Sequence, residues 1–280
     1  MYALIAIGYT LVYGVLRFIN FAHSDVFMAG AFAGLHVGRA MGGASWAGGL
    51  VAMLASMAIC AALGVVIERL AYKPLRERSR LTVLITAIGV SMLLQNLGQI
   101  VFGATPVAFP ETLPATTFGA GGVVVSSKDV VVVGFTAVLL GALELVVLRT
   151  KVGTAMRAVA HNHNAAALMG IPTNRIISFT FGLGSALAAA AGFLWAYKFP
   201  RVDPYLGVMP GLTAFVAAVL GGIGNITGAA MGGLLLGIIE TWMKGSRWST
   251  WTEAVTFVLL ILVLMFRPAG LLGRVQAEKV

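Results

Sequence analysis

The chain alternates between long apolar runs and short polar connections. Each run approaches the length of about 20 residues that a helix needs to cross the hydrocarbon core of a bilayer. The runs lie at 3–16, 26–40, 47–67, 81–102, 129–148, 176–197, 210–243 and 253–266. A glycine-rich stretch at 221–228 interrupts the seventh run. The pattern predicts an all-α fold: one polytopic transmembrane helix bundle over residues 1–280, with about eight spans and a broken helix near 221–228.

The first run is short and follows Met1 almost at once. It has neither a basic start nor a cleavage-type ending, so we do not expect a signal peptide. We expect instead that the sequence begins within a longer first span.

Composition excludes two broad classes of protein. Apolar residues make up 59% of the 280 residues and charged residues only 10%, whereas soluble domains carry about a quarter charged residues. A soluble enzyme and a disordered chain are therefore both excluded. The single cysteine, Cys60, allows neither a disulfide nor a cysteine metal site. His23 and Asp25 lack a third ligand, and no catalytic triad stands out, so we expect no metal site and no catalytic site.

The net charge of +9 reflects basic residues concentrated in alternate connections. If the spans alternate in direction, 13 of the 19 lysines and arginines fall on one side. The positive-inside rule makes that side cytoplasmic and predicts a multi-pass protein of the inner membrane. Scattered loop charges do not form the continuous basic face of a nucleic-acid-binding protein. Residues 103–128, which contain three prolines, then form an external loop.

Polar residues within the spans are candidates for a transport path. Ser91 and Gln95 share one face of a helix, with Asn96 beside them. Because polar groups are costly in lipid, this face should turn toward the bundle interior or a wet cavity; hydrogen bonding that only holds helices together is the alternative. The stretch 221–228 is either a broken helix that lines a substrate site or a tight turn at the cytoplasmic surface. Residues 20–25 form either part of the path or simply a polar loop.

The segment 149–175 is amphipathic and too polar to span the membrane. Ala165, Ala166, Leu168 and Met169 give it an apolar patch. Such a helix suits docking into a groove of a partner protein. A helix lying on the membrane surface is the alternative.

Several stretches resemble the permeases for branched-chain amino acids of ABC importers (the LivH type). The similar stretches cover nearly the whole chain in order: ALIAIGYTLVYG at 3–14, INFAHSDVFMAG at 19–30, IERLAYKPLR at 67–76, ITAIGVSMLLQN at 85–96, RAVAHNHNAAALMGI at 157–171, AAVLGGIGNITGAAMGG at 217–233 and FRPAGLLGR at 266–274. The pattern from Asn164 to Gly170 is similar to the EAA loop, which inserts into the ATPase subunit. Asn164 stands where that loop has glutamate, and Ser24 stands where the family usually has glycine.

The resemblance implies a permease that is not itself an enzyme and needs no cofactor of its own. It implies four kinds of partner: a second, LivM-like permease, two ATP-binding cassette subunits that use ATP, a periplasmic solute-binding protein and the lipid bilayer. We predict that the residues coupling the chain to the ATPase are Arg157, Asn164, Ala165, Ala166 and Gly170. We predict that the translocation path includes Asn20, His23, Ser91, Gln95, Asn96, Gly221, Gly222, Gly224 and Gly228.

Two other functions stay open at this point. A urea or short-amide ABC permease would share the fold. An ion-coupled secondary transporter would work alone, and it would need an ionisable coupling site within the membrane.

Overall fold

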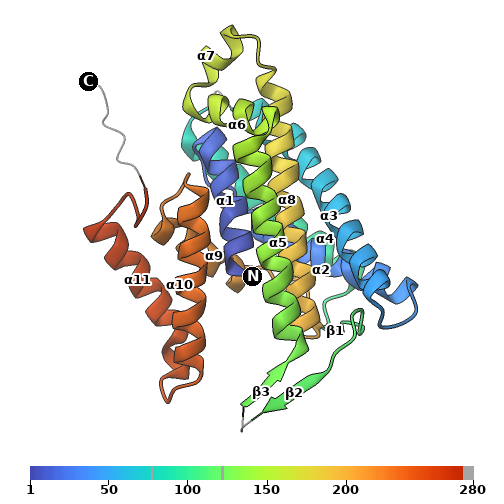
Figure 1. The fold of residues 1–280 in the computed structure, drawn as a ribbon. Coiled ribbons are helices and arrows are strands. Elements are labelled where there is room, and N and C mark those ends of the chain that lie inside the picture. The colour runs from blue at the N-terminus through green and yellow to red at the C-terminus, as the bar shows by residue number, and fades with distance from the viewer. Residues whose placement is uncertain (77, 121–122, 274–280) are drawn as a thin grey trace.

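A computed structural model describes residues 1–76, 78–120 and 123–273 (Figure 1). It confirms the all-α fold. The helices in the bundle are α1 (Tyr2–Leu16), α2 (His23–Ala40), α3 (Trp46–Ile67), α4 (Arg80–Phe102), α5 (Ser127–Arg149), α8 (Thr173–Lys198), α9 (Val208–Gly221), α10 (Ile226–Lys244) and α11 (Thr252–Phe266). Two short helical turns extend α3: η1 (Glu68–Tyr72) and η2 (Lys73–Leu75). A third, η3 (Ser249–Trp251), precedes α11.

Six helices in the described part of the chain are long and apolar enough to cross a membrane. They cover Trp46–Leu75, Leu81–Phe102, Ser127–Arg149, Thr173–Lys198, Ile226–Lys244 and Ser249–Phe266. Two further apolar helices, α1 and α9, are shorter. Helix α2 is largely buried among its neighbours. The predicted apolar runs therefore all form helices.

Helix α8 is the central helix of the bundle and packs through small residues. A Cβ atom on Gly192 would lie 2.1 Å from the carbonyl oxygen of Phe27 in α2. A Cβ on Gly64 of α3 would lie 2.0 Å from Ser185 Oγ, and one on Gly30 would lie 2.4 Å from the Cα of Ala189. Small residues let helix backbones approach closely in a membrane, where no hydrophobic force drives helices together. The glycines of α2, α3 and α8 thus set the spacing of the core.

The predicted interruption of the seventh run is confirmed, and the chain reverses direction there. Gly221 and Gly228 pack against each other: a Cβ on either one would lie within 2.3 Å of the other's carbonyl oxygen. Gly222 has φ 108° and Gly224 has φ 94°, a region that only glycine occupies without strain. Helices α9 and α10 are therefore an antiparallel hairpin joined by a tight turn.

The connections gather at two opposite ends of the bundle (Figure 1). Helices α6 (Lys151–His161) and α7 (His163–Leu168) lie at one end. At the other end, β1 (Val107–Ala108) pairs with β4 (Arg201–Val202), and β2 (Thr117–Ala120) pairs with β3 (Val123–Ser126), all antiparallel. The segment 103–128 is thus largely extended chain, far from α6 and α7.

Candidate functional site

A partly buried polar contact joins α2 to α4. Asp25, only 1% exposed, accepts a hydrogen bond of 2.9 Å from Gln95 Nε2 at its Oδ1. The same nitrogen lies 3.2 Å from Ser91 Oγ. Ser91 and Gln95 therefore face the bundle, as their spacing predicts, and Asp25 is their partner.

The polar segment 20–25 is a turn at 20–22 followed by the first residues of a helix at 23–25, and most of it is buried. Helix α2 already begins at His23, which is 1% exposed. Gly8 of α1 makes room for the imidazole, because a Cβ there would lie 2.1 Å from Nε2. The His23 ring meets the Tyr9 ring edge-on, with the centroids 4.9 Å apart. Asn20 accepts a hydrogen bond of 2.5 Å from Tyr72 Oη at its Oδ1.

Other polar residues of α4 point in different directions. Asn96 is exposed, and its Nδ2 donates a hydrogen bond of 2.7 Å to the carbonyl of Met92 in its own helix. Gln99, one turn beyond Gln95, donates a hydrogen bond of 2.6 Å to Tyr205 Oη. The structure therefore brings Ser91 and Gln95 together with Asp25, and it separates Asn96 from them.

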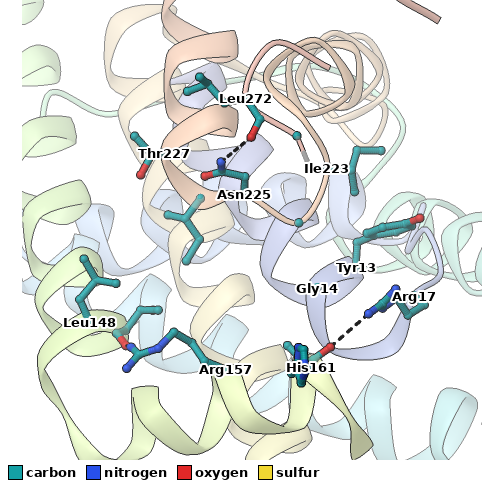
Figure 2. Close-up of a pocket in the computed structure, with 15 residues that line it drawn as sticks. Tyr13, Gly14, Arg17, Leu148, Arg157, His161, Ile223, Asn225, Thr227 and Leu272 are labelled. Carbon is teal, nitrogen blue, oxygen red and sulfur yellow. Dashed lines mark hydrogen bonds between the residues drawn. The ribbon is translucent and has the colours of Figure 1, made fainter. Parts of the chain in front are cut away.

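Of the predicted path glycines, Gly224 lines a cavity of about 730 Å³ near α6. Figure 2 shows the turn at Ile223 and Asn225 on one side of the cavity and Arg157 and His161 of α6 on the other. The end of α1 contributes Tyr13, Gly14 and Arg17 to the lining of the cavity. A predicted path residue, Gly224, and a predicted coupling residue, Arg157, thus line the same cavity.

Hydrogen bonds hold the turn between α9 and α10 to the described end of the chain. Asn225 Oδ1 accepts from the amide of Gly228, 3.1 Å away, and caps α10. Its Nδ2 donates to the carbonyl of Leu272, 2.8 Å away (Figure 2). The amide of Leu271 donates to the carbonyl of Leu220, also at 2.8 Å. These contacts fix the turn, which agrees with the tight-turn alternative.

Helix α6 is fastened to the end of α5. Arg157 donates to the carbonyl of Val147 in the last turn of α5, where a basic side chain satisfies an unpaired carbonyl. Thr150 Oγ1 accepts from the amide of Gly153 at 3.0 Å and caps α6. On the other side, Arg17 donates a hydrogen bond of 3.3 Å to the carbonyl of Ala160 (Figure 2). Arg157 therefore positions α6 against the bundle.

Helix α7 presents an exposed apolar tip. Leu168 is 88% exposed and Met169 is 82% exposed, whereas Ala166 is buried. Asn164 and Ala165 are also exposed. Gly170, with φ 81°, ends the helix through the bond from its amide to the carbonyl of Ala167 at 3.0 Å, as glycine commonly does after a helix. The predicted coupling residues that are exposed at this tip are therefore Asn164, Ala165 and Gly170, next to Leu168 and Met169.

A buried ion pair, which sequence reasoning missed, ties the start of α8 to the end of α3. The Glu68 side chain is fully buried and pairs with Arg76. Ser178 Oγ donates a hydrogen bond of 2.5 Å to the same carboxylate, and Arg76 donates one of 2.7 Å to Asn174 Oδ1. Because α8 follows α7 directly, this cluster connects the α6–α7 segment to the central helix.

In the described ranges, no group of three or more histidine, cysteine, aspartate or glutamate side chains is placed to hold a metal ion. Apolar helices long enough to span a membrane, packed around internal polar contacts, are the architecture of a polytopic membrane protein.

Comparison with known proteins identifies the family. The family described as "Branched-chain amino acid transport system / permease component" matches residues 1–264. The chain is 44% identical over 287 aligned residues to the high-affinity branched-chain amino acid transport system permease protein BraD of Pseudomonas aeruginosa, and the match covers 100% of this chain and 94% of BraD. It is 41% identical to the corresponding permease protein LivH of Escherichia coli, covering 100% of this chain and 93% of LivH. The ribose import permease protein RbsC of Escherichia coli is 27% identical, covering 93% of this chain and 81% of RbsC. No solved structure matches.

The chain belongs to the family of branched-chain amino acid transport permease components. Such proteins are subunits of transporters and not enzymes. The chain is accordingly a multi-pass protein of the bacterial inner membrane.

Proposed function

We propose that this chain is the permease subunit of an ATP-driven importer for branched-chain amino acids. It acts with a second, LivM-like permease, two ATP-binding cassette subunits and a periplasmic solute-binding protein, and it needs no cofactor of its own. The observation that carries the proposal is the identity of 41–44% to branched-chain amino acid permeases along the whole chain. RbsC, whose name gives ribose as its solute, is only 27% identical.

The α6–α7 end is the cytoplasmic, ATPase-facing end in this proposal. Arg17, Arg76 and Arg157 lie there, in agreement with the positive-inside rule. The tip at Leu168 and Met169 enters a groove of the ATPase subunit. Motion of α7 reaches the bundle along two routes. One runs through α8, which the Glu68–Arg76 pair holds at its start, and the other runs through α6 to the cavity at Gly224. Coupling of this kind requires packed elements with two discrete arrangements.

The translocation path runs along the contact between α2 and α4 in this proposal, with Gln95 as its central polar side chain. Leucine at position 95 removes the donor to Asp25 and leaves a buried carboxylate with one partner fewer. We expect ATP-driven uptake by Gln95→Leu to fall about tenfold, equivalent to about 1.4 kcal/mol, with normal amounts of protein in the membrane. The proposed path leaves out Asn96, which is exposed and whose hydrogen bond among the described residues goes to its own helix. Asn96→Leu is therefore the matched control. Equal uptake by the two variants would remove Gln95 from the path.

The solute class is tested by uptake in a strain that lacks its own branched-chain amino acid importers. The strain should express this chain together with the subunits encoded beside it. We expect labelled leucine, isoleucine and valine to accumulate and to compete with one another, while labelled urea does not accumulate. Accumulation of urea, or of a short amide, without uptake of leucine would replace the proposed solute with the alternative one.

A further inference from the structure

The carboxylate of Asp25 lies inside the bundle without a cation beside it. The residue is only 1% exposed, and the ion pairs of the described ranges are formed by Glu68, Asp129 and Glu240 instead. Gln95 Nε2 donates to Oδ1, whereas Oδ2 is buried and has no hydrogen-bond partner among the described residues. A buried carboxylate is costly unless opposite charge and hydrogen bonds compensate it. Asp25 therefore has an unused acceptor for a positively charged donor.

The position of this carboxylate along α4 places it at membrane depth. Its partner Gln95 lies about 22 Å from the start of α4 at Arg80 and about 10 Å from the end of α4 at Phe102, at about 1.5 Å per residue. Helix α4 is long and apolar enough to cross a membrane. Ionisable groups at such a depth commonly belong to the pathway of a polar solute.

Helix α4 covers Asp25 and packs lightly on the rest of the bundle. Few of its residues are buried, and Leu93, for example, is 56% exposed. It contacts α2 through Gln95 and, nearer its last residue, through the stacked rings of Phe32 and Phe102, whose centroids are 4.2 Å apart. Separation of α4 from α2 therefore breaks few contacts and uncovers the carboxylate.

The acceptors at this position match a primary ammonium group. The amide nitrogen of Gln95 lies 2.9 Å from Asp25 Oδ1 and 3.2 Å from Ser91 Oγ, so a nitrogen donor already fits between them. An amide has two N–H donors, whereas a primary ammonium has three and carries positive charge. The third donor can use the unpartnered Oδ2. A divalent metal ion is a poorer match, because it prefers six or more oxygen ligands and no group of three metal-binding side chains gathers in the described ranges.

We propose that Asp25 receives the α-ammonium group of the amino acid as it passes between α2 and α4. This inference rests on the proposed function, since it takes the solute to be an amino acid. When α4 moves away, Gln95 releases the carboxylate, and the ammonium group donates to both carboxylate oxygens and to Ser91. Charge-assisted hydrogen bonds are stronger than neutral ones, so the solute displaces the Gln95 amide. Gln95 returns after the solute leaves and covers the carboxylate again.

A pair of photoreactive probes tests this contact in the wild-type complex. One probe is leucine with a diazirine in its side chain, and the other is its N-acetyl derivative, which lacks the ammonium group. The permease complex with its ATPase subunits is irradiated with each probe, and labelled peptides are identified by mass spectrometry. We expect the free amino acid to label α2 and α4 about tenfold more than the N-acetyl derivative, the effect of one charge-assisted hydrogen bond. Unlabelled leucine should prevent this labelling.

Asparagine at position 25 separates the charge from the structural contact, because its amide oxygen still accepts from Gln95. We expect Asp25→Asn to lower leucine uptake and labelling by about tenfold or more. Its thermal unfolding midpoint should stay the same or rise, because an uncompensated buried charge is lost. Asp25→Glu, which keeps the charge, should retain part of both activities. The matched control is Asp129→Asn, since Asp129 already pairs with Lys198 in a partly exposed position and such pairs contribute little; its uptake should be normal.

Three results would overturn the proposal while leaving leucine transport by the wild type in place. They are equal labelling by the two probes, full uptake and labelling by Asp25→Asn, and a thermal midpoint of Asp25→Asn that falls together with its uptake. The last would give Asp25 a structural role only. Absence of ATP-driven leucine uptake by the wild-type complex would instead overturn the proposed function, and this inference with it.

Discussion

Aspartate at both Leu168 and Met169 should abolish ATP-driven uptake by this permease while leaving its helix bundle folded. Both side chains are more than four-fifths exposed, so the substitutions break no internal packing. In the proposed complex the two side chains enter an apolar groove, where a central anchor contributes about 2 kcal/mol or more to binding. Association with the ATPase subunits should weaken by about thirtyfold or more for each 2 kcal/mol lost.

Two measurements check this expectation: the amount of ATPase that co-purifies with the permease, and the uptake rate. The matched control exchanges the residues, as Leu168→Met with Met169→Leu, which keeps the apolar tip and should keep uptake. The thermal unfolding midpoint of the isolated permease should not differ between the two double variants. Normal ATPase association and normal uptake in the aspartate variant would remove α7 as the docking element.

Leucine in place of Gly192 should prevent the bundle from packing. The Cβ position at Gly192 lies 2.1 Å from the carbonyl oxygen of Phe27, and a backbone atom in a buried helix cannot move aside alone. Overpacking of a core commonly costs about 1–3 kcal/mol, and we expect at least the upper end here because the contact is with main chain. The variant should give little monodisperse protein after extraction, with a lowered thermal midpoint.

Gly134→Leu on α5 is the control for this prediction. Apart from nearby residues of α5 itself, no described atom lies within 4 Å of its Cβ position, and leucine favours a helix over glycine by about 1 kcal/mol. Its yield and thermal midpoint should match or exceed those of the wild type. If the Gly192 and Gly134 variants are equally stable, close contact between α2 and α8 does not hold this bundle together.

The helices were predictable because lipid demands long apolar segments with satisfied backbones. The start of α2 was harder to predict, since His23 and Asp25 are polar residues between two apolar runs and suggest a loop. Their burial depends on space left by Gly8 and on a hydrogen bond from Gln95, 70 positions further along the chain. No local pattern encodes contacts of that range.

The ion pair of Glu68 and Arg76 shows a different limit. Their stretch, 67–76, is one of those that resemble known permeases, yet neither resemblance nor spacing names Asn174 and Ser178 as their partners. The turn at 222–225 was predictable as an interruption from its glycines. Its reversal of direction follows from the contact of Gly221 with Gly228, which the sequence leaves undetermined.

In the proposed mechanism, this chain moves branched-chain amino acids only when partner subunits use ATP. The most direct test is leucine uptake into proteoliposomes that contain the whole complex and its binding protein, with ATP supplied on the side that carries α6 and α7. We expect uptake that requires ATP, persists when ionophores collapse the proton and sodium gradients, and is absent with this chain alone. Uptake by this chain alone, driven by an ion gradient without ATP, would contradict it.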